Sequence, residues 1–230
     1  MAVIEAFNLT KIYHESEVPV RALGGVSFEV DEGEFTAIVG PSGSGKSTLL
    51  HILGGLDRQD QGSVKVAGVD LNSLSSSKLI EFRLFNIGFV FQAYNLIPVL
   101  TARENVEFIM LLQKFSKSKR QTRAQELIDA VGLSQRADHR PVQLSGGEQQ
   151  RVAVARSLAS NPRFVLADEP TANLDSQAAE NLLSIMAELN KKSGTVFLFS
   201  THDKRVIERA RRVITLRDGE IESDEKQTGT

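Results

Sequence analysis

Short apolar runs alternate with longer amphipathic stretches along most of the chain, a pattern that predicts both strands and helices. The runs at 35–39, 164–167 and 195–200 are almost wholly apolar, as expected for buried strands of a sheet covered on both faces. The run at 26–30 alternates apolar and polar residues, as expected for a strand with one wet face. We therefore expect an α/β fold with a mainly parallel sheet and an antiparallel β lobe supplied by the early strands.

The other elements of the core follow from the same two periodicities. Alternating or glycine-bounded runs predict strands, and apolar residues spaced three or four apart predict helices. Further strands are expected at 7–13, 62–68, 87–91 and 213–216, and further helices at 76–85, 178–189 and from about residue 204.

The middle of the chain, from residue 101 to about residue 158, is expected to be helical, beginning with a capping box at Thr101 and Glu104. Five Lys or Arg residues lie between 114 and 123. We interpret them as a solvated linker into a helix at 124–131, in preference to a docking patch. The chain would then be one domain with three parts: a core from 1–92 and 160–222, a helical subdomain at about 93–159, and a flexible tail at 223–230.

One glycine-rich stretch joins the strand at 35–39 to a predicted helix that starts near Gly45. Glycine, four residues and then Gly-Lys-Ser is the spacing of a P-loop, and a preceding strand and following helix are its proper context. The backbone N–H groups form a concavity for an anion, to which the helix start adds positive charge. The lysine would meet the terminal phosphates, and the serine hydroxyl is a ligand for Mg²⁺. The stretch is Gly40, Pro41, Ser42, Gly43, Ser44, Gly45, Lys46 and Ser47, followed by Thr48.

Composition narrows the class of protein. With 230 residues, 41% of them hydrophobic, the chain can bury a real core. A net charge of −2 offers no basic field for nucleic acid or an anionic membrane surface. Without cysteine there is no disulfide, thiolate metal site or thiol nucleophile. The N-terminus lacks the features of a signal peptide, and no apolar run approaches the ~18 residues of a membrane span, so we expect a soluble protein.

An acidic pair, Asp168 and Glu169, directly follows the apolar strand at 164–167. Ligands bind beyond the carboxyl ends of strands in open α/β sheets. Asp168 is therefore placed to hold Mg²⁺, and Glu169 to polarise a water for attack on the γ-phosphate. A solvated acidic turn before Pro170 is the alternative.

A second glycine-rich helix start lies at 144–151, which reads Leu-Ser-Gly-Gly-Glu-Gln-Gln-Arg. Its serine and two glycines, Ser145, Gly146 and Gly147, make another site for phosphate oxygens. A plain helix N-cap without a ligand is the alternative. Two phosphate-binding helix starts so far apart in one chain require an explanation.

At this point the sequence resembles the ATP-binding cassette (ABC) ATPases. Leu144–Glu148 beside Asp168 and Glu169 looks like their signature and Walker B elements, and the motifs follow the family's order from Tyr13 to Gly219. Glu148 is a departure, because glutamine is commoner there in the family.

The resemblance implies roles for four further residues. It makes Tyr13 the aromatic residue that stacks on adenine, and Gln92 the glutamine that reaches Mg²⁺ and senses a membrane partner. It places Asp175 in a loop that crosses a dimer interface, and makes His202 the histidine that contacts the γ-phosphate. The plain alternatives are an edge-strand aromatic for Tyr13, a loop histidine for His202, and a helix cap for Asp175, which does not exclude the interface role.

The resemblance also explains the two phosphate sites. It implies a head-to-tail dimer in which the ATP on the P-loop of one copy is covered by Ser145, Gly146 and Gly147 of the second. Closure and hydrolysis would power a separate integral membrane transporter subunit, with no nucleic acid partner and the chain lying on the cytoplasmic face of the membrane. The implied cofactors are ATP and Mg²⁺, the catalytic residues are Glu169, His202 and Lys46, and the Mg²⁺ ligands are Ser47, Gln92 and Asp168.

Within the family, the segments at 53–57, 89–98 and 166–175 look like the branch that powers lipoprotein release and macrolide efflux. In that branch hydrolysis drives a mechanical movement of the membrane subunit. The partner would lay a short helix in a groove beside the Gln92 segment. We expect that contact near Tyr94, Leu96, Ile97, Leu100 and Val106, which would otherwise be ordinary core residues.

Two other classes of function compete with a transporter ATPase. A relative that acts on DNA would carry a long coiled-coil insertion, and a relative that acts in translation would carry two cassettes; the chain contains neither. A P-loop kinase would transfer phosphate to an acceptor other than water, which the 144–151 motif and Glu169 argue against. An ATPase assay without an acceptor would separate the kinase from the ATPase.

Overall fold

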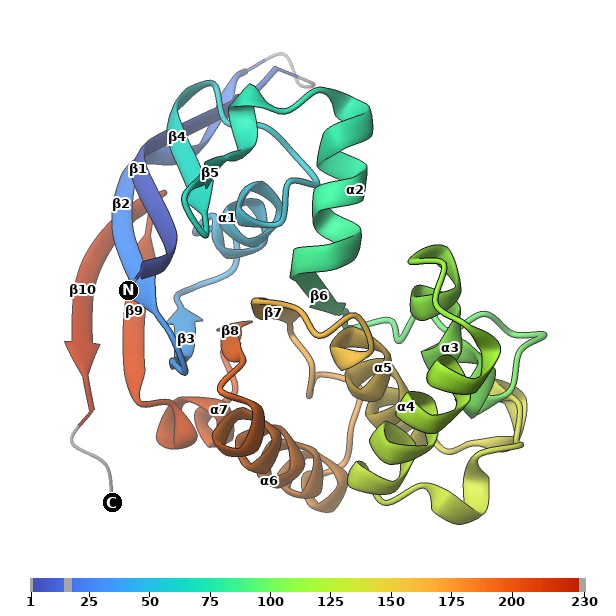
Figure 1. The fold of residues 1–230 in the computed structure, drawn as a ribbon. Coiled ribbons are helices and arrows are strands. Elements are labelled where there is room, and N and C mark those ends of the chain that lie inside the picture. Colours follow the sequence, from blue (N-terminus) through green and yellow to red (C-terminus); the bar gives the residue numbers. More distant parts are fainter. Residues whose placement is uncertain (1, 15–17, 228–230) are drawn as a thin grey trace. The chain divides into compact units, whose positions relative to one another are not determined.

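The computed structural model of the protein describes residues 2–14 and 18–227. The chain forms two compact units, one from Met1–Arg83 with Val196–Thr230 and the other from Leu84–Thr195. Both units mix strands and helices (Figure 1). The α/β character expected from the sequence is confirmed in each of them.

The first unit contains an antiparallel β lobe with the strand order β2-β1-β4-β5. Every second residue of β2 from Val26 to Val30 is buried, which is the alternation that the sequence predicted. The two long strands extend beyond the expected bounds because their pairing continues through β-bulges. The strands are β1 (Ala2–Tyr13), β2 (Val20–Asp31), β4 (Gln61–Val66) and β5 (Val69–Asp70).

The same unit holds the parallel strands that carry the P-loop. Strand β3 (Phe35–Val39) pairs in parallel with β8 (Val196–Ser200) and with β9 (Arg212–Arg217). The phenylalanines Phe35, Phe197 and Phe199 are almost fully buried and pack with ring centroids 4.6–6.1 Å apart. This aromatic cluster fixes the strands whose carboxyl ends hold the site. The helices of this unit are α1 (Lys46–Leu53) and α7 (Lys204–Arg209), and α2 (Ser76–Asn86) leads out of it.

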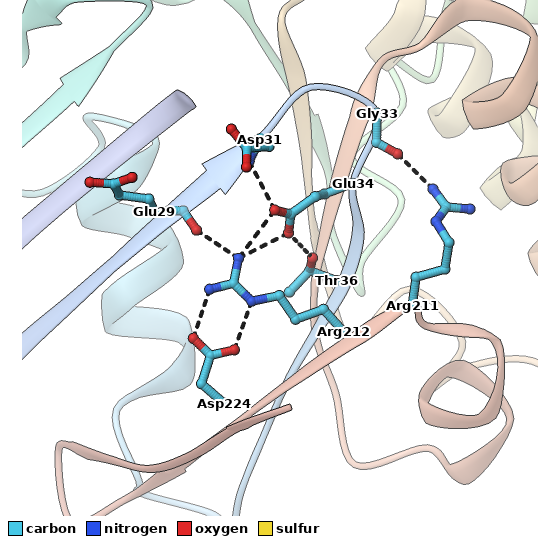
Figure 2. Close-up of polar contacts among 8 residues, drawn as sticks. All are labelled: Glu29, Asp31, Gly33, Glu34, Thr36, Arg211, Arg212 and Asp224. Atoms are coloured by element: carbon cyan, nitrogen blue, oxygen red, sulfur yellow. Dashed lines mark hydrogen bonds and ion pairs between the residues drawn. The ribbon is translucent and has the colours of Figure 1, made fainter. Parts of the chain in front are cut away.

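The C-terminal segment corrects one expectation. Residues 223–226, expected to be flexible, belong to strand β10 (Glu220–Lys226), which pairs with β9 in antiparallel fashion. Arg212 of β9 holds this strand by donating two hydrogen bonds, each 2.7 Å long, to the carboxylate of Asp224 (Figure 2). The segment is polar, so its sequence did not predict a strand. Its side chains hold it through an ion pair rather than through apolar burial. Residues 228–230 of the expected tail lie outside the described residues.

The second unit carries two parallel strands, β6 (Ile87–Val90) and β7 (Phe164–Asp168), and a set of helices. Helices α3, α4 and α5 contact one another, and α5 also packs on β6 (Figure 1). The capping box at Thr101 and Glu104 is present at the start of α3, as predicted. The helices are α3 (Ala102–Leu112), α4 (Lys117–Ala130), α5 (Gly146–Leu158) and α6 (Ser176–Ser193).

The basic stretch before residue 124 is not a linker, because α4 already begins at Lys117. Ser116 caps that helix by accepting a hydrogen bond from the N–H of Lys119. Arg120 donates to the carbonyl of Phe115 and lies 3.8 Å from a carboxylate oxygen of Glu107. Four of the five charges, those from Lys117 onward, therefore lie on a helix that has its own cap. The missed signal was the capping residue Ser116, directly before Lys117.

Candidate nucleotide site

The P-loop of the first unit connects β3 to α1 in a conformation that only glycine permits at two positions. A Cβ on Gly40 would lie 2.1 Å from the carbonyl oxygen of Leu216, and a Cβ on Gly45 would lie 2.3 Å from that of Ala22. Both residues also have positive φ, 150° and 99°. The glycines are therefore needed for the path of the backbone, which turns tightly at the end of a buried strand.

The start of α1 is built differently from the other long helices. No side chain among the described residues caps it, and its N-cap residue is Gly45. Helices α3, α4, α5 and α6 each have a side-chain cap. The first N–H groups of α1 are thus available to an anion.

Two side chains of the P-loop carry polar groups that suit an anion. The Nζ atom of Lys46 donates to the carbonyl oxygens of Gly40 and Pro41, 2.9 Å away in each case. The hydroxyl of Ser44 is buried and finds no hydrogen-bond partner within the described part of the chain. A cation, an unpaired hydroxyl and an uncapped helix start together suit a phosphate group.

Tyr13, at the end of β1, is held by polar contacts in the same unit. Its hydroxyl donates to a carboxylate oxygen of Asp57 at 2.8 Å, and it shares a side-chain hydrogen bond with Thr48 of α1. The ammonium group of Lys11 bonds Asp57 at 2.9 Å and lies 5.0 Å from the centre of the Tyr13 ring. The tyrosine predicted to stack on adenine is thus bonded to the P-loop helix itself.

The second glycine-rich motif begins α5 with a complete capping box. The hydroxyl of Ser145 accepts a hydrogen bond from the N–H of Glu148, whose carboxylate accepts one from the N–H of Ser145. This N–H lowers the pKa of Glu148 below the ordinary glutamate value, against the effect of burial, and Arg136, 3.3 Å away, acts in the same direction. The glutamate that departs from the family pattern therefore has a clear local role.

The segment after β6, which includes Gln92, has no regular structure, yet side chains hold four of its carbonyl groups. Gln150, fully buried in α5, donates to the carbonyls of Phe91 at 3.2 Å and Pro170 at 2.8 Å. Asn173 donates to the carbonyl of Gln92 at 3.0 Å. The guanidinium of Arg156 donates to the carbonyls of residues 94 and 95. These bonds join the Gln92 segment to α5 and to the loop that follows β7.

Two glycines of the 144–151 motif, Gly146 and Gly147, pack closely against neighbouring segments of the same unit. A Cβ on Gly146 would lie 2.7 Å from the hydroxyl of Tyr94, which itself lies 3.5 Å from the carbonyl oxygen of Asn173. A Cβ on Gly147 would meet Ala178 of α6 at 3.1 Å. The two glycines let the Gln92 segment and the start of α6 approach the signature closely.

The acidic pair lies at the carboxyl end of β7. Asp168 is the last residue of the strand, and Glu169 follows with a φ of 46°, a left-handed conformation that is uncommon for a residue with a side chain. Asp175 caps α6 by accepting a hydrogen bond from the N–H of Ala178 at 2.8 Å, as the sequence allowed. In the first unit, His202 lies in the exposed turn between β8 and α7.

Within each unit the structure brings predicted residues together: Tyr13 with Thr48 in the first, and in the second Gln92 with Asn173 and Tyr94 with Gly146. Sequence reasoning missed the residues that bind them to each other. Gln150 and Asn173 lie inside recognised motifs. Only the fact that carbonyls of an irregular segment need hydrogen-bond donors could have identified these two residues from the sequence. Asp57 lies in the segment 53–57, which resembles one branch of the family, but the sequence suggested no chemical role for it.

A strand, a glycine-rich loop with lysine, and an uncapped helix define a P-loop nucleotide-binding protein. The family model for the ABC transporter ATP-binding domain matches residues 23–172. An ABC transporter ATP-binding protein from Thermotoga maritima, itself described as uncharacterized, is 49% identical over 225 residues, which is 98% of this chain and 96% of that protein. The chain belongs to the ABC transporter family, as its ATP-binding, ATP-hydrolysing cassette.

Solved structures agree with this assignment and confirm the ABC ATPase fold. The cassette MJ0796, described as a bacterial ABC transporter cassette, is 44% identical, covers 99% of this chain and all of its own, and matches with a TM-score of 0.90. One of its structures is a dimer in a post-hydrolysis state with ADP and phosphate. The protein cbiO1 of Clostridium perfringens, part of the transporter complex cbiONQ, is 25% identical, covers 98% of this chain and 88% of its own, and matches with a TM-score of 0.88. Among residues 2–14 and 18–227, no helix of this chain has the length and apolarity to cross a bilayer.

Proposed function

We propose that this cassette is the motor of a transporter, in which ATP-driven closure of two copies and subsequent hydrolysis move a separate membrane subunit. The P-loop carries the proposal, because its uncapped helix start, buried unpaired hydroxyl and inward lysine suit a bound triphosphate. ATP would lie along residues 40–48, with its adenine stacked on Tyr13.

Mg²⁺ would be held by the hydroxyl of Ser47, the amide oxygen of Gln92 and the carboxylate of Asp168. All three are oxygen donors, the kind that Mg²⁺ prefers, so the residues present fit the ion. Bound Mg²⁺ supplies charge neutralisation at the β- and γ-phosphates. Glu169 would accept the proton of the attacking water, and His202 would contact the γ-phosphate.

We propose that the two copies bind head to tail. Ser145, Gly146 and Gly147 of one copy would cover the ATP on the P-loop of the other, and the loop with Asp175 would cross the interface. The hydroxyl of Ser145 accepts its capping bond and keeps its hydrogen for donation to a phosphate oxygen. The dimeric structures of MJ0796 support this arrangement by analogy.

A groove in the second unit supports a membrane partner. It has a volume of about 330 Å³ and is lined by Phe91 and Ile97 of the segment that includes Gln92 and by Ile109 of α3. A short amphipathic helix of a membrane subunit fits such a groove, which would place the cassette on the cytoplasmic face of the membrane. We propose the lipoprotein-release and macrolide-efflux branch for it, and export or mechanical transmission as its output. Ile97→Glu, at a residue that lines the groove, should prevent assembly with that subunit, and unimpaired assembly would place the contact elsewhere.

Glu169→Gln tests the motor function directly. The variant should bind ATP as the native protein does, hydrolyse it at a small fraction of the native rate, and accumulate as an ATP-dependent dimer in analytical ultracentrifugation. Lys46→Ala should instead lose ATP binding. Native hydrolysis by Glu169→Gln would remove Glu169 from the general-base role.

A mixing experiment tests the head-to-tail arrangement. Lys46→Ala and Ser145→Arg should each be nearly inactive alone, since one damages the P-loop and the other the covering motif. In a mixed dimer one site has both parts intact, so an equimolar mixture should recover up to about a quarter of the native rate if the sites fire independently. A mixture as inactive as its components, under conditions where mixed dimers are detected by mass spectrometry, would count against shared sites.

A further inference from the structure

The P-loop helix ends in a segment, 54–57, that folds back and presents Asp57 to Tyr13. The N–H groups of Leu56 and Asp57 donate to the carbonyl of His51, at 2.8 and 3.2 Å. The N–H of Arg58 donates to the carboxylate itself at 2.7 Å. Main-chain bonds thus fix the position of this carboxylate relative to α1.

We infer that Asp57 positions Tyr13 for adenine, so that one helix sets the distance between the phosphate and base subsites. This inference rests on the proposed nucleotide site and adds to it a residue with no assigned role. The phosphates would meet the first turn of α1, whereas the ring of Tyr13 is tied to Thr48 in that turn and to Asp57 just beyond the last one. A tyrosine on a β lobe acquires its orientation from the helix that binds the phosphates.

Lys11 completes the arrangement. Its ammonium group bonds the other oxygen of Asp57 at 2.9 Å and the carbonyl of Arg58 at 2.7 Å. Because it also lies over the Tyr13 ring, the adenine would stack on the opposite face of that ring. Burial acts to raise the pKa of Asp57, but hydrogen bonds from Lys11 and Tyr13 outweigh it and hold the pKa below the usual range. The carboxylate is therefore ionised at neutral pH, as an acceptor of two such bonds must be.

The experiment compares two probes, ATP and inorganic tripolyphosphate, which has no base. Asp57→Asn should weaken ATP binding by roughly fivefold to tenfold, the usual effect of losing a charge-assisted hydrogen bond at a partly exposed site. Tripolyphosphate binding should stay within about twofold of native, because the P-loop is untouched. Tyr13→Phe should weaken ATP binding in the same way, and the double variant should be no weaker than the stronger single change, since both remove the bond between Tyr13 and Asp57.

Asp60→Asn is the matched control. Its carboxylate lies in the same loop and accepts a hydrogen bond from the N–H of Ile12 at 2.7 Å, which an asparagine oxygen can replace. It should bind both probes as the native protein does. A loop that is merely disordered by Asp57→Asn would lower tripolyphosphate and ATP binding together, and that result would overturn the inference.

Tyr13→Ala separates this inference from the proposed site. If Tyr13→Ala binds ATP as tightly as the native protein, Tyr13 is not the adenine platform and the proposed role of Tyr13 fails. If Tyr13→Ala weakens ATP binding while Asp57→Asn and Tyr13→Phe do not, the site stands and the positioning role of Asp57 is wrong.

Discussion

Arg212 bonds three different residues of the first unit, and its removal gives a sharp test of what holds the C-terminal strand. Its guanidinium makes two 2.7 Å bonds to Asp224, one 2.6 Å bond to the carbonyl of Glu29, and two longer bonds to the carboxylate of Glu34 (Figure 2). The hydrogen bonds with Asp224, ahead of the charge of Glu34, raise the pKa of Arg212 against the effect of burial. The group stays charged throughout the pH range of any folding experiment.

The loss of stability expected on removing Arg212 follows from how deeply its ion pairs are buried. The side chain of Arg212 is only 12% exposed, that of Glu34 is 17% exposed, and that of Asp224 is 34% exposed. Removing one partner of a buried ion pair costs about 3–5 kcal/mol, and the exposure of Asp224 places the estimate at the lower end. Arg212→Met keeps the aliphatic stem and removes every bond, so we expect a loss of about 3 kcal/mol, or roughly 6–12 °C in melting temperature for a chain of this size.

The assay is urea unfolding followed by circular dichroism, with amide hydrogen exchange of β10 as a local probe. Arg217→Met is the matched control, because this arginine of the same hairpin pairs with Glu222 at 2.8 Å while both side chains are largely exposed, at 62% and 44%. Exposed pairs contribute about 0–1 kcal/mol, so the control should change stability by less than ~1 kcal/mol. Equal effects of the two variants would refute the reasoning that burial, rather than the count of ion pairs, decides the cost.

The remaining predictions concern the loop, α5 and its cap. Gly40→Ala should abolish ATP binding, because its Cβ would lie 2.1 Å from a main-chain oxygen. Gly43→Ala has open space around its Cβ but a φ of 82°, so it should cost only about 1–2 kcal/mol of stability. Isothermal titration measures the first effect and thermal melts the second. Gln150→Leu should lower stability by about 2–4 kcal/mol, because it leaves the part-buried carbonyl of Phe91 and the buried carbonyl of Pro170 without this donor; urea unfolding checks this. Glu148→Gln should melt slightly below the native protein at pH 7, and the difference should shrink as pH falls below 4.5: the lowered pKa of Glu148 means that its stabilisation is complete above the ordinary value of 4.5 and is lost as pH falls through the lowered one. Melting curves at pH 7 and at stepwise lower pH values test the sign.

Sequence patterns were sufficient for the elements that carry a strong period or a known cap. Strand β3 has its expected bounds, and the cap of α3 at Thr101 is the predicted one. The failures, at the start of α4 and along β10, share one cause: both segments are polar, and they are stabilised by specific bonds from Ser116 and Arg212 rather than by an apolar face. The periodicity of hydrophobic residues cannot predict such bonds.

The site shows a similar division. Motif spacing led to the P-loop and the acidic pair as the proposed ATP site, because phosphate chemistry dictates their residue types. It could not indicate Gln150, Asn173 or Asp57, whose tasks depend on which carbonyl or hydroxyl lies opposite them in space. Those contacts exist only once distant segments have met, so they are properties of the fold rather than of the motif.

The bonding of the Gln92 segment has a consequence for how a membrane subunit could act on hydrolysis. An irregular segment with free carbonyls would move by itself when a partner binds beside it. Here Gln150 and Arg156 tie the carbonyls of this segment to α5, which begins with the covering motif, and Asn173 ties it to the loop between Glu169 and α6. Because the interior of a packed unit shifts between discrete arrangements rather than deforming smoothly, a displacement of this segment must move α5 and the loop after β7 with it or break these hydrogen bonds. If a membrane subunit binds the groove as proposed, the side chains that hold these carbonyls would connect that subunit to the proposed catalytic segments.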